Sequence, residues 1–118
     1  FSLRDRATGQ PVICGGSMQT GSYLLAGTET AVRDTFASTM HGAGRTMSRT
    51  QAKRAIRGEQ LQQQMQQQGI LVKAVSMSGL AEEAGFAYKN ISDVVASVDR
   101  AGITKVVAEL RPIGNIKG

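Results

Sequence analysis

Residues 12–36, with the sequence VICGGSMQTGSYLLAGTETAVRDTF, indicate the fold class of this chain. The apolar run 12–14 and the run 23–26 (YLLA) each predict a short strand. Between them lies a loop of small residues that begins at Gly15. Thr28 follows the second run and is a favourable N-cap for a helix. One stretch of the chain therefore combines two strands with a helix.

The helix expected after Thr28 has Val32 and Phe36 four residues apart, which places both on one helix face. Strand and helix patterns continue without a repeated unit or a linker, which predicts one α+β domain over residues 1–118, with a mixed sheet and flanking helices. Residues 1–10 read as a polar strand end and turn. The other expected elements are a helix from near Ser48 with a capping box to Gln51, a helix over 59–68 stopped by Gly69, a strand over 70–75, a short helix over 80–84 after Gly79, a helix capped by Ser92 that ends at Gly102, and a final strand over 106–110.

The composition is that of a small globular protein rather than of a disordered chain. The 118 residues include no Trp, three Phe and two Tyr, so the core must consist mainly of aliphatic, Ala and Met side chains. The net charge of +5 favours an anionic partner such as nucleic acid or nucleotide phosphate, although a basic domain without such a partner has the same charge. No stretch approaches a membrane span, and we expect neither a signal peptide nor a membrane partner.

Cys14 is the only cysteine, so it cannot form a disulfide within the chain. One cysteine and one histidine also cannot make a conventional four-ligand zinc site. The apolar neighbours of Cys14 favour a buried small side chain. This cysteine usage fits a reducing compartment, and we expect a cytoplasmic protein. Because the chain begins at Phe1 rather than at Met, we expect a processed product or a fragment.

His41, the only histidine, is the strongest candidate for a catalytic residue. A lone histidine is more often structural, but His41 lies between small polar residues and the turn Gly42-Ala43-Gly44 rather than in an apolar face. Neutral imidazole is a competent nucleophile near neutral pH, and a glycine turn lets backbone N–H groups approach an anion closely. Arg45 and Arg49 follow, and the forked donors of arginine suit phosphate. Together these residues favour phosphoryl or nucleotidyl transfer.

Other features have a structural and a functional interpretation. The loop over residues 15–18 is an ordinary turn or a loop that faces a nucleotide. Tyr88 is a packing tyrosine or a platform for a stacked base. Lys117 would ordinarily be a frayed, solvated lysine. A basic helix face is either merely solvated or follows an RNA backbone, and its members are Arg49, Lys53, Arg54 and Arg57.

Several blocks of the sequence resemble the RtcB-type RNA ligase family, in the family's order and with fitting spacing. Residues 38–49 (STMHGAGRTMSR) resemble the highly specific signature around the guanylylated histidine of that family. Residues 15–18 (GGSM), followed by Ser22 and Tyr23, resemble its nucleotide loop. The later blocks 79–84 (GLAEEA), 87–89 (AYK) and 110–118 (LRPIGNIKG) are similar to the family's last part, so the resemblance covers nearly the whole chain.

The resemblance implies an enzyme that joins RNA ends, such as tRNA halves or broken RNA, with GTP and manganese. It implies that a ring nitrogen of His41 attacks the α-phosphate of GTP and forms a phosphoramidate with guanylate. The guanylate would then pass to an RNA 3′-phosphate, after hydrolysis of any 2′,3′-cyclic phosphate. A 5′-hydroxyl would finally attack the activated end.

The resemblance also implies roles for individual residues. Ser17 and Ser22 would line the nucleotide pocket, Tyr88 would stack on guanine, and Lys117 would bond the guanine edge. Backbone donors to phosphate would come from Gly42, Ala43 and Gly44, and contacts to RNA or phosphate from Arg45 and Arg49.

The family's manganese ligands (a Cys, an Asp and several His) lie upstream of the matching region, so we expect no metal ligand in this chain. A metal activates phosphate by neutralising its charge. The isolated chain is therefore expected to be inactive and to need the upstream half of the same enzyme as a partner.

Two positions also depart from the family pattern. Gln19 stands where a glycine is usual and Gly85 where a proline is common, and neither removes a proposed reacting group.

Alternatives to a ligase fragment remain open. The isolated, metal-free chain could act only as a module that binds nucleotide or RNA. It could also associate with itself, through apolar surface that would pack against further chain in the longer enzyme.

Overall fold

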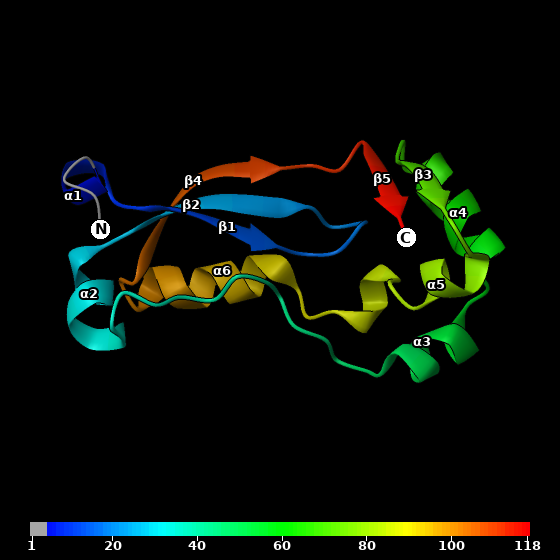
Figure 1. Ribbon diagram of the computed structural model, residues 1–118, viewed down its shortest axis with the longest axis horizontal. Coiled ribbons are helices and arrows are strands. Elements are labelled where there is room, and N and C mark those ends of the chain that lie inside the picture. The colour runs from blue at the N-terminus through cyan, green and yellow to red at the C-terminus, as the bar shows by residue number, and fades with distance from the viewer. Residues whose placement is uncertain (1–4) are drawn as a thin grey trace.

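The computed structural model describes residues 5–118 and confirms the predicted α+β class (Figure 1). In chain order, the elements are α1 (Asp5–Thr8), β1 (Pro11–Gly15), β2 (Ser22–Gly27), α2 (Glu29–Thr35), α3 (Arg49–Ala55), α4 (Gly58–Gln67), β3 (Leu71–Ala74), α5 (Met77–Ala81), the 3₁₀ helix η1 (Gly85–Ala87), α6 (Ile91–Arg100), β4 (Thr104–Leu110) and β5 (Gly114–Lys117). The molecule is elongated, with extents of 47 × 24 × 22 Å. Figure 1 shows α1 and α2 at one end, and α3, α4, α5 and β5 at the other.

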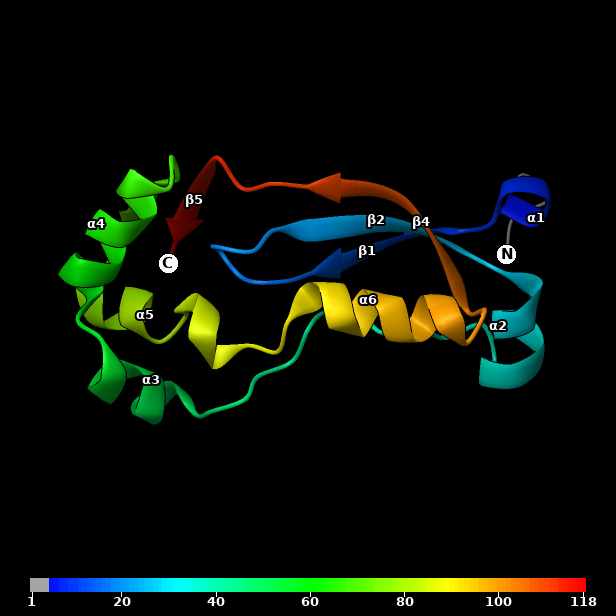
Figure 2. The same ribbon diagram turned by 180° about the vertical axis from the view of Figure 1, so that it is seen from behind.

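β1, β2 and β4 form an antiparallel sheet in that order, and Cys14 pairs with Tyr23 in its register. Alternation along the strands turns Cys14 and Leu25 to the same face, where both are completely buried. Ile91 and Val95, four residues apart on α6, pack against them. Both ribbon views show α6 running alongside this sheet (Figures 1 and 2). This cluster confirms the prediction that Cys14 acts as a small buried side chain.

A second apolar cluster lies at the other end of the molecule, among α4, β3 and α5. Leu61 and Met65, predicted to share one helix face, are buried on α4 and pack with Val72 and Leu80. Met18, from the loop between β1 and β2, is buried in the same cluster. The loop between β1 and β2 is therefore anchored in both apolar clusters, because Cys14 of β1 belongs to the first and Met18 to the second.

Two predicted helix caps are confirmed. The Thr28 side chain accepts the N–H of Ala31 at the start of α2. Ser48 and Gln51 form the predicted capping box at the start of α3. Within residues 5–118, no helix is long and apolar enough to cross a membrane.

Two other predicted helix starts are wrong, because a capping side chain stands slightly earlier in the chain. Asn90, rather than Ser92, caps α6, since its side chain accepts the N–H groups of Ser92 and Asp93. Ser76 caps α5, so Gly79 lies inside that helix rather than before it. Asn and Ser side chains at these positions satisfy backbone donors that the first helical turn leaves unpaired.

Three further expectations are corrected. The polar stretch 1–10 contains a short helix, α1, in its described part, and residues 1–4 lie outside the described residues. Phe36 does not share a helix face with Val32, because it ends α2 in a left-handed conformation with φ of 54° and is 94% exposed. Gly58 does not precede the next helix but is its first residue, buried against Met77.

The end of the chain differs most from the expectation, because β4 is not the final strand. β5 pairs in parallel with β3, with Lys73 opposite Ile116 and Ala74 opposite Lys117. The N–H of Val75 also donates to the backbone oxygen of Lys117, at 3.1 Å. Lys117 is therefore held in a strand rather than frayed. The parallel strands β3 and β5 thus form one sheet, and the antiparallel strands β1, β2 and β4 form another.

Candidate functional site

The loop between β1 and β2 is a tight, internally bonded turn. The N–H of Gly16 donates to the oxygen of Gly21 at 2.9 Å, and the Ser17 hydroxyl accepts the N–H groups of Gln19 and Thr20, both at 3.2 Å. A Cβ at Gly16 would stand 2.3 Å from the Gly21 oxygen. Only glycine fits at position 16. The close contact between the Gly16 and Gly21 backbones fixes the position of Ser17, the next residue.

The segment that contains His41 lies beside the start of this loop. Gly15 forms a parallel bridge with Gly42: its N–H donates to the His41 oxygen at 3.0 Å, and its oxygen accepts the Ala43 N–H at 2.9 Å. In such a bridge the N–H of Gly42 points to the opposite side of its segment. The Ala43 N–H, one of the predicted phosphate donors, is thus already bonded to Gly15. The His41 residue is exposed.

The other side of the His41 segment is bonded to the chain around Tyr88. Arg45 and Tyr88 form an antiparallel bridge, and the N–H of Lys89 donates to the Gly44 oxygen at 2.9 Å. The glycine turn is therefore held between the end of β1 and the segment that carries Tyr88. These bonds place the predicted nucleophile and the predicted stacking tyrosine on neighbouring segments.

A cavity of about 240 Å³ brings together the residues predicted to hold the nucleotide base. Its lining residues are Gly15, Gly16, Ser17, Met18, Ser22, Glu83, Tyr88, Asn115 and Lys117. Four of these were predicted at this site: Ser17, Ser22, Tyr88 and Lys117. The volume is below the ~300–1,000 Å³ typical of sites that enclose a whole ligand, and suits a fragment such as a heterocyclic base.

The remaining predicted residues lie outside the lining of this cavity. His41, Gly42, Ala43 and Gly44 lie in the adjacent segment, and Arg45 and Arg49 lie behind Tyr88 and Glu83. The exposed His41 is therefore outside the cavity lining, and its segment is bonded to Gly15, which does line the cavity. Such a separation suits a ligand whose base is enclosed and whose phosphates extend outwards.

Arg45 and Tyr88 form a compact pair at the wall of the cavity. The Arg45 guanidinium donates to Tyr88 Oη at 3.1 Å and to the backbone oxygens of Glu82 and Met47, at 2.6 and 3.1 Å. It also lies 4.9 Å from the centre of the Tyr88 ring, close enough for a cation–π contact. Arg45, predicted to contact RNA or phosphate, is thus engaged within the chain and does not line the cavity.

Burial raises the pKa of the Tyr88 hydroxyl, and its hydrogen bond to the Glu83 carboxylate raises that pKa further. The positive charge of Arg45 acts in the opposite direction. The hydroxyl therefore stays protonated and donates to Glu83. A protonated hydroxyl with two fixed partners holds the Tyr88 side chain in its rotamer.

Glu83 and Asn115 are the cavity residues that the sequence interpretation did not single out. The side chain of Asn115 donates to the Met18 oxygen at 3.3 Å, which fastens β5 to the glycine loop. Glu83 lies in the GLAEEA block shortly before Tyr88, so an acidic candidate stood near one predicted site residue in the sequence.

The basic face of α3 is partly neutralised by two neighbouring carboxylates. Arg49 Nε lies 3.8 Å from Glu83 Oε1, and Lys53 Nζ lies 2.9 Å from Glu82 Oε1. The hydrogen bond and charge of Lys53 lower the pKa of Glu82. The face predicted to follow an RNA backbone therefore contains ion pairs within the chain.

The described residues do not form a manganese site. No group of three or more His, Cys, Asp or Glu side chains converges within residues 5–118. Cys14 is completely buried, its thiol lies 3.0 Å from the Met40 sulfur, and burial raises its pKa, which disfavours the thiolate that metals bind. Glu83 is already surrounded by cations. The described residues thus do not fit the ion.

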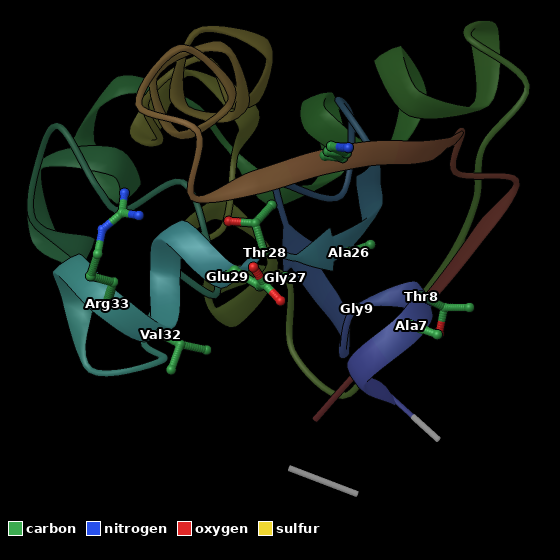
Figure 3. Close-up of a pocket in the computed structure, with 10 residues that line it drawn as sticks. Ala7, Thr8, Gly9, Ala26, Gly27, Thr28, Glu29, Val32 and Arg33 are labelled. Atoms are coloured by element: carbon green, nitrogen blue, oxygen red, sulfur yellow. The ribbon is translucent and has the colours of Figure 1, made fainter. Parts of the chain in front are cut away.

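A larger cavity of about 750 Å³ lies at the opposite end of the molecule. Its lining residues are Ala7, Thr8, Gly9, Ala26, Gly27, Thr28, Glu29, Val32, Arg33 and Lys105. Figure 3 shows the labelled ones at the end of α1, at the end of β2 and along α2, and Lys105 belongs to β4. None of them is a predicted site residue. Arg33 Nε lies 2.9 Å from Oδ1 of Asp34, a residue that does not line this cavity.

The two departures from the family pattern contact each other. The N–H of Gly85 donates to the Gln19 side-chain oxygen at 2.7 Å. A proline at position 85 would lack this N–H, and a glycine at position 19 would lack the acceptor. This hydrogen bond ties the glycine loop to the segment that carries Tyr88.

Comparison with known proteins identifies relatives over nearly the whole chain. A tRNA-splicing ligase RtcB of Pyrococcus horikoshii is 55% identical over 113 residues, which are 96% of this chain and 13% of the relative. A tRNA-splicing ligase RtcB of Methanopyrus kandleri is 56% identical over 109 residues, 92% of this chain and 11% of the relative. One of Archaeoglobus fulgidus is 55% identical over 113 residues, 96% of this chain and 23% of the relative. The chain thus spans less than a quarter of each.

The sequence profile of the family described as tRNA-splicing ligase RtcB matches residues 2–118. The match and the identities of the relatives agree with the resemblance found in the sequence blocks. The chain belongs to the RtcB tRNA-splicing ligase family.

Proposed function

We propose that this chain supplies the nucleophile and the guanine-binding part of a GTP-dependent RNA ligase. The ligase would join an RNA 3′-phosphate or 2′,3′-cyclic phosphate end to a 5′-hydroxyl end through guanylylated His41. In this proposal residues 1–118 are a single domain in the C-terminal part of a longer, cytoplasmic enzyme. Its partners are GTP, RNA such as tRNA halves or broken RNA, and the upstream half of the same enzyme.

The observation that carries the proposal is the convergence of four predicted residues on one base-sized cavity beside the His41 segment. Ser17, Ser22, Tyr88 and Lys117 come from three separate parts of the chain, yet all line the same cavity. Tyr88 offers an aromatic surface for stacking. Lys117 offers a charged donor, which suits the acceptor edge of guanine (O6 and N7). The cavity thus has the groups that guanine binding needs.

The chemistry of the proposal uses the exposed position of His41 beside the cavity. With guanine enclosed, the phosphates of GTP would extend towards the exposed imidazole. A ring nitrogen would form a bond to the α-phosphorus while the bond to pyrophosphate breaks. An oxygen of the RNA 3′-phosphate would next displace His41 and take the guanylate. Attack by a 5′-hydroxyl would then form the new phosphodiester and release GMP.

The backbone around His41 has a supporting role in this proposal. Gly42 and Gly44 remain candidates for phosphate donors, since the N–H of Gly42 points away from β1. Ala43 would act indirectly, because its N–H holds the segment against Gly15. Manganese, which the family uses, would neutralise phosphate charge when bound by residues outside this chain.

The proposal is tested by transferring the chain into a longer relative. In a chimera, residues 1–118 replace the matching region of the Archaeoglobus fulgidus ligase, which provides the remaining sequence. After incubation with GTP and manganese, intact mass spectrometry should show a gain of one guanylate. The gain should disappear in His41→Ala. A folded chimera that gains guanylate equally with and without His41 would refute the assignment.

A matched pair of lysine variants tests the base cavity separately. Lys117→Ala should weaken GMP binding about tenfold, the effect of one lost charge-assisted hydrogen bond. Lys105→Ala removes the same charge from the distant cavity and should leave GMP binding within twofold of the parent. Equal effects of the two substitutions would show that only the overall charge matters.

A second candidate function is supported by the surface of the chain. Several large apolar side chains are exposed, among them Ile13 at 68% and Val107 at 60%, and α3 carries basic side chains. The isolated, metal-free chain could therefore bind only nucleotide or RNA, or associate with itself. Sedimentation of the chain alone, and titration with GMP and with short RNA, distinguish these cases from a working half-site.

A further inference from the structure

The Glu83 carboxylate stands where several site residues meet. Oε2 accepts the hydrogen bond of the Tyr88 hydroxyl and lies 3.8 Å from Lys117 Nζ and 3.6 Å from Arg45 Nη1. Oε1 lies 3.8 Å from Arg49 Nε. The side chain is only 15% exposed and lines the cavity. A carboxylate so enclosed is costly unless charges and donors compensate it, and here all of them are candidate site residues.

We propose that Glu83 is the positioning residue of the cavity, and that it fixes the Tyr88 ring and the Lys117 ammonium in the orientation that a guanine base requires. The inference rests on the proposed function, because the base is the ligand of the cavity in that function. Glu83 itself does not touch the reacting atoms. It acts through the two side chains that it holds.

The need for such a residue follows from the side chains themselves. A lysine ammonium sits on a flexible stem with many rotamers. Strand pairing with Ala74 fixes the Lys117 backbone, but only Glu83 among residues 5–118 forms an ion pair with its side chain. The ion pair directs the ammonium towards the cavity. It leaves the other ammonium donors free for the acceptor edge of a base.

Tyr88 is held from two directions. Its hydroxyl donates to Glu83 and accepts from Arg45 Nη1, so the side chain cannot swing to another χ1 rotamer without breaking these bonds. The Arg45 guanidinium lies against the ring and does not line the cavity. Because Glu83 also attracts Arg45 and Arg49, one carboxylate connects the base cavity to the segment that follows His41.

A merely structural role for Glu83 makes different predictions. If Glu83 served only to neutralise nearby arginines, removing the Glu82 carboxylate would have the same effect on Tyr88 titration and GMP affinity as removing the Glu83 carboxylate. Glu82 provides the matched comparison. It is the adjacent carboxylate, pairs with Lys53 at 2.9 Å, and does not line the cavity.

The test compares Glu83→Gln with Glu82→Gln in the 118-residue chain, with circular dichroism as a check of folding. Glu83→Gln retains an oxygen that can accept from Tyr88 but removes the negative charge. The first readout needs no nucleotide: ultraviolet titration of the tyrosine hydroxyls, with Tyr88→Phe used to assign the Tyr88 signal. Glu83→Gln should lower the pKa of Tyr88, because the nearby negative charge is lost, and Glu82→Gln should leave it unchanged.

The second readout is the affinity for GMP and for AMP, measured by calorimetry. Glu83→Gln should weaken GMP binding about tenfold and reduce the preference for GMP over AMP, since Lys117 and Tyr88 lose their common anchor. Glu82→Gln should change neither value more than twofold. A folded Glu83→Gln variant with unchanged Tyr88 titration and unchanged GMP affinity overturns the proposal, as does an equal loss in Glu82→Gln.

The two readouts separate failure of this inference from failure of the proposed function. If the parent chain does not bind GMP but the Tyr88 titration responds to Glu83→Gln, guanine binding is refuted while the positioning of Tyr88 by Glu83 is supported. If GMP binds well in both parent and Glu83→Gln, guanine binding is supported and the role of Glu83 is refuted.

Discussion

The hydrogen bond between Gly85 and Gln19 predicts that proline at position 85 has opposite effects in two backgrounds. The backbone itself accepts a proline there. Ala84 has φ of −54° and ψ of 143°, the extended conformation favoured before proline, and Gly85 is the first residue of η1, where proline is well tolerated. The obstacle is Gln19, because a Cβ at position 85 would lie 2.8 Å from its side-chain oxygen.

The magnitudes follow from this geometry. Gly85→Pro alone removes the 2.7 Å hydrogen bond, worth about 0.5–1.5 kcal/mol, and crowds the Gln19 side chain. The loss exceeds the ~0.4–1 kcal/mol that proline contributes in a compatible conformation by restricting the unfolded chain. In a Gln19→Gly background neither the bond nor the crowding exists. There, Gly85→Pro should stabilise the chain by about 0.5 kcal/mol.

Urea denaturation of the parent, the two single variants and the double variant measures this coupling. The expected interaction energy is about 1–2 kcal/mol, with slopes of the unfolding free energy against urea unchanged. If Gly85→Pro shifts the unfolding free energy by the same amount in both backgrounds, the two residues do not interact and the reasoning is wrong.

Three further predictions concern the core, a close backbone contact and pH. Leu61→Ala should destabilise the chain by about 2–5 kcal/mol in urea denaturation, because Leu61 is 1% exposed at the centre of the second cluster. Gly58→Ala should destabilise by about 1–3 kcal/mol in the same assay, although alanine ordinarily favours a helix, because its Cβ would lie 2.0 Å from the Met77 oxygen. Folding raises the pKa of Tyr88, so its stabilising effect is complete below the unfolded value of about 10 and is lost as pH rises through the folded value. Thermal unfolding at several alkaline pH values should therefore show a steeper loss of stability in the parent than in Tyr88→Phe.

Local features of the fold were predictable from the sequence because their causes are local. The caps at Thr28 and Ser48 depend on side chains within one helical turn. The burial of Leu61 and Met65 follows from helical spacing alone. The prediction of Ser92 as the cap of α6 is wrong, since Ser and Asn both cap helices and only the backbone conformation selects Asn90.

Pairing between distant segments was not predictable in this way. Nothing near Lys117 signals that its segment pairs in parallel with β3, because the partner strand lies far back in the chain. The family resemblance supplied Ser17, Ser22, Tyr88 and Lys117, and the structure places all four on one cavity, while their roles remain predictions. The charges that gather around Glu83 depend on the tertiary fold, which explains why it was missed.

The pairing of β5 with β3 also has a consequence for the order of folding. Two lining residues of the cavity are joined by the hydrogen bond from Asn115 to the Met18 oxygen, which spans 97 positions of the chain. Contacts over such separations form slowly, because a long loop must be closed before they contribute. The helices and the β1–β2 hairpin can form early from local contacts. We therefore expect the base cavity to be among the last parts to become structured, with native-like helix content appearing before nucleotide affinity.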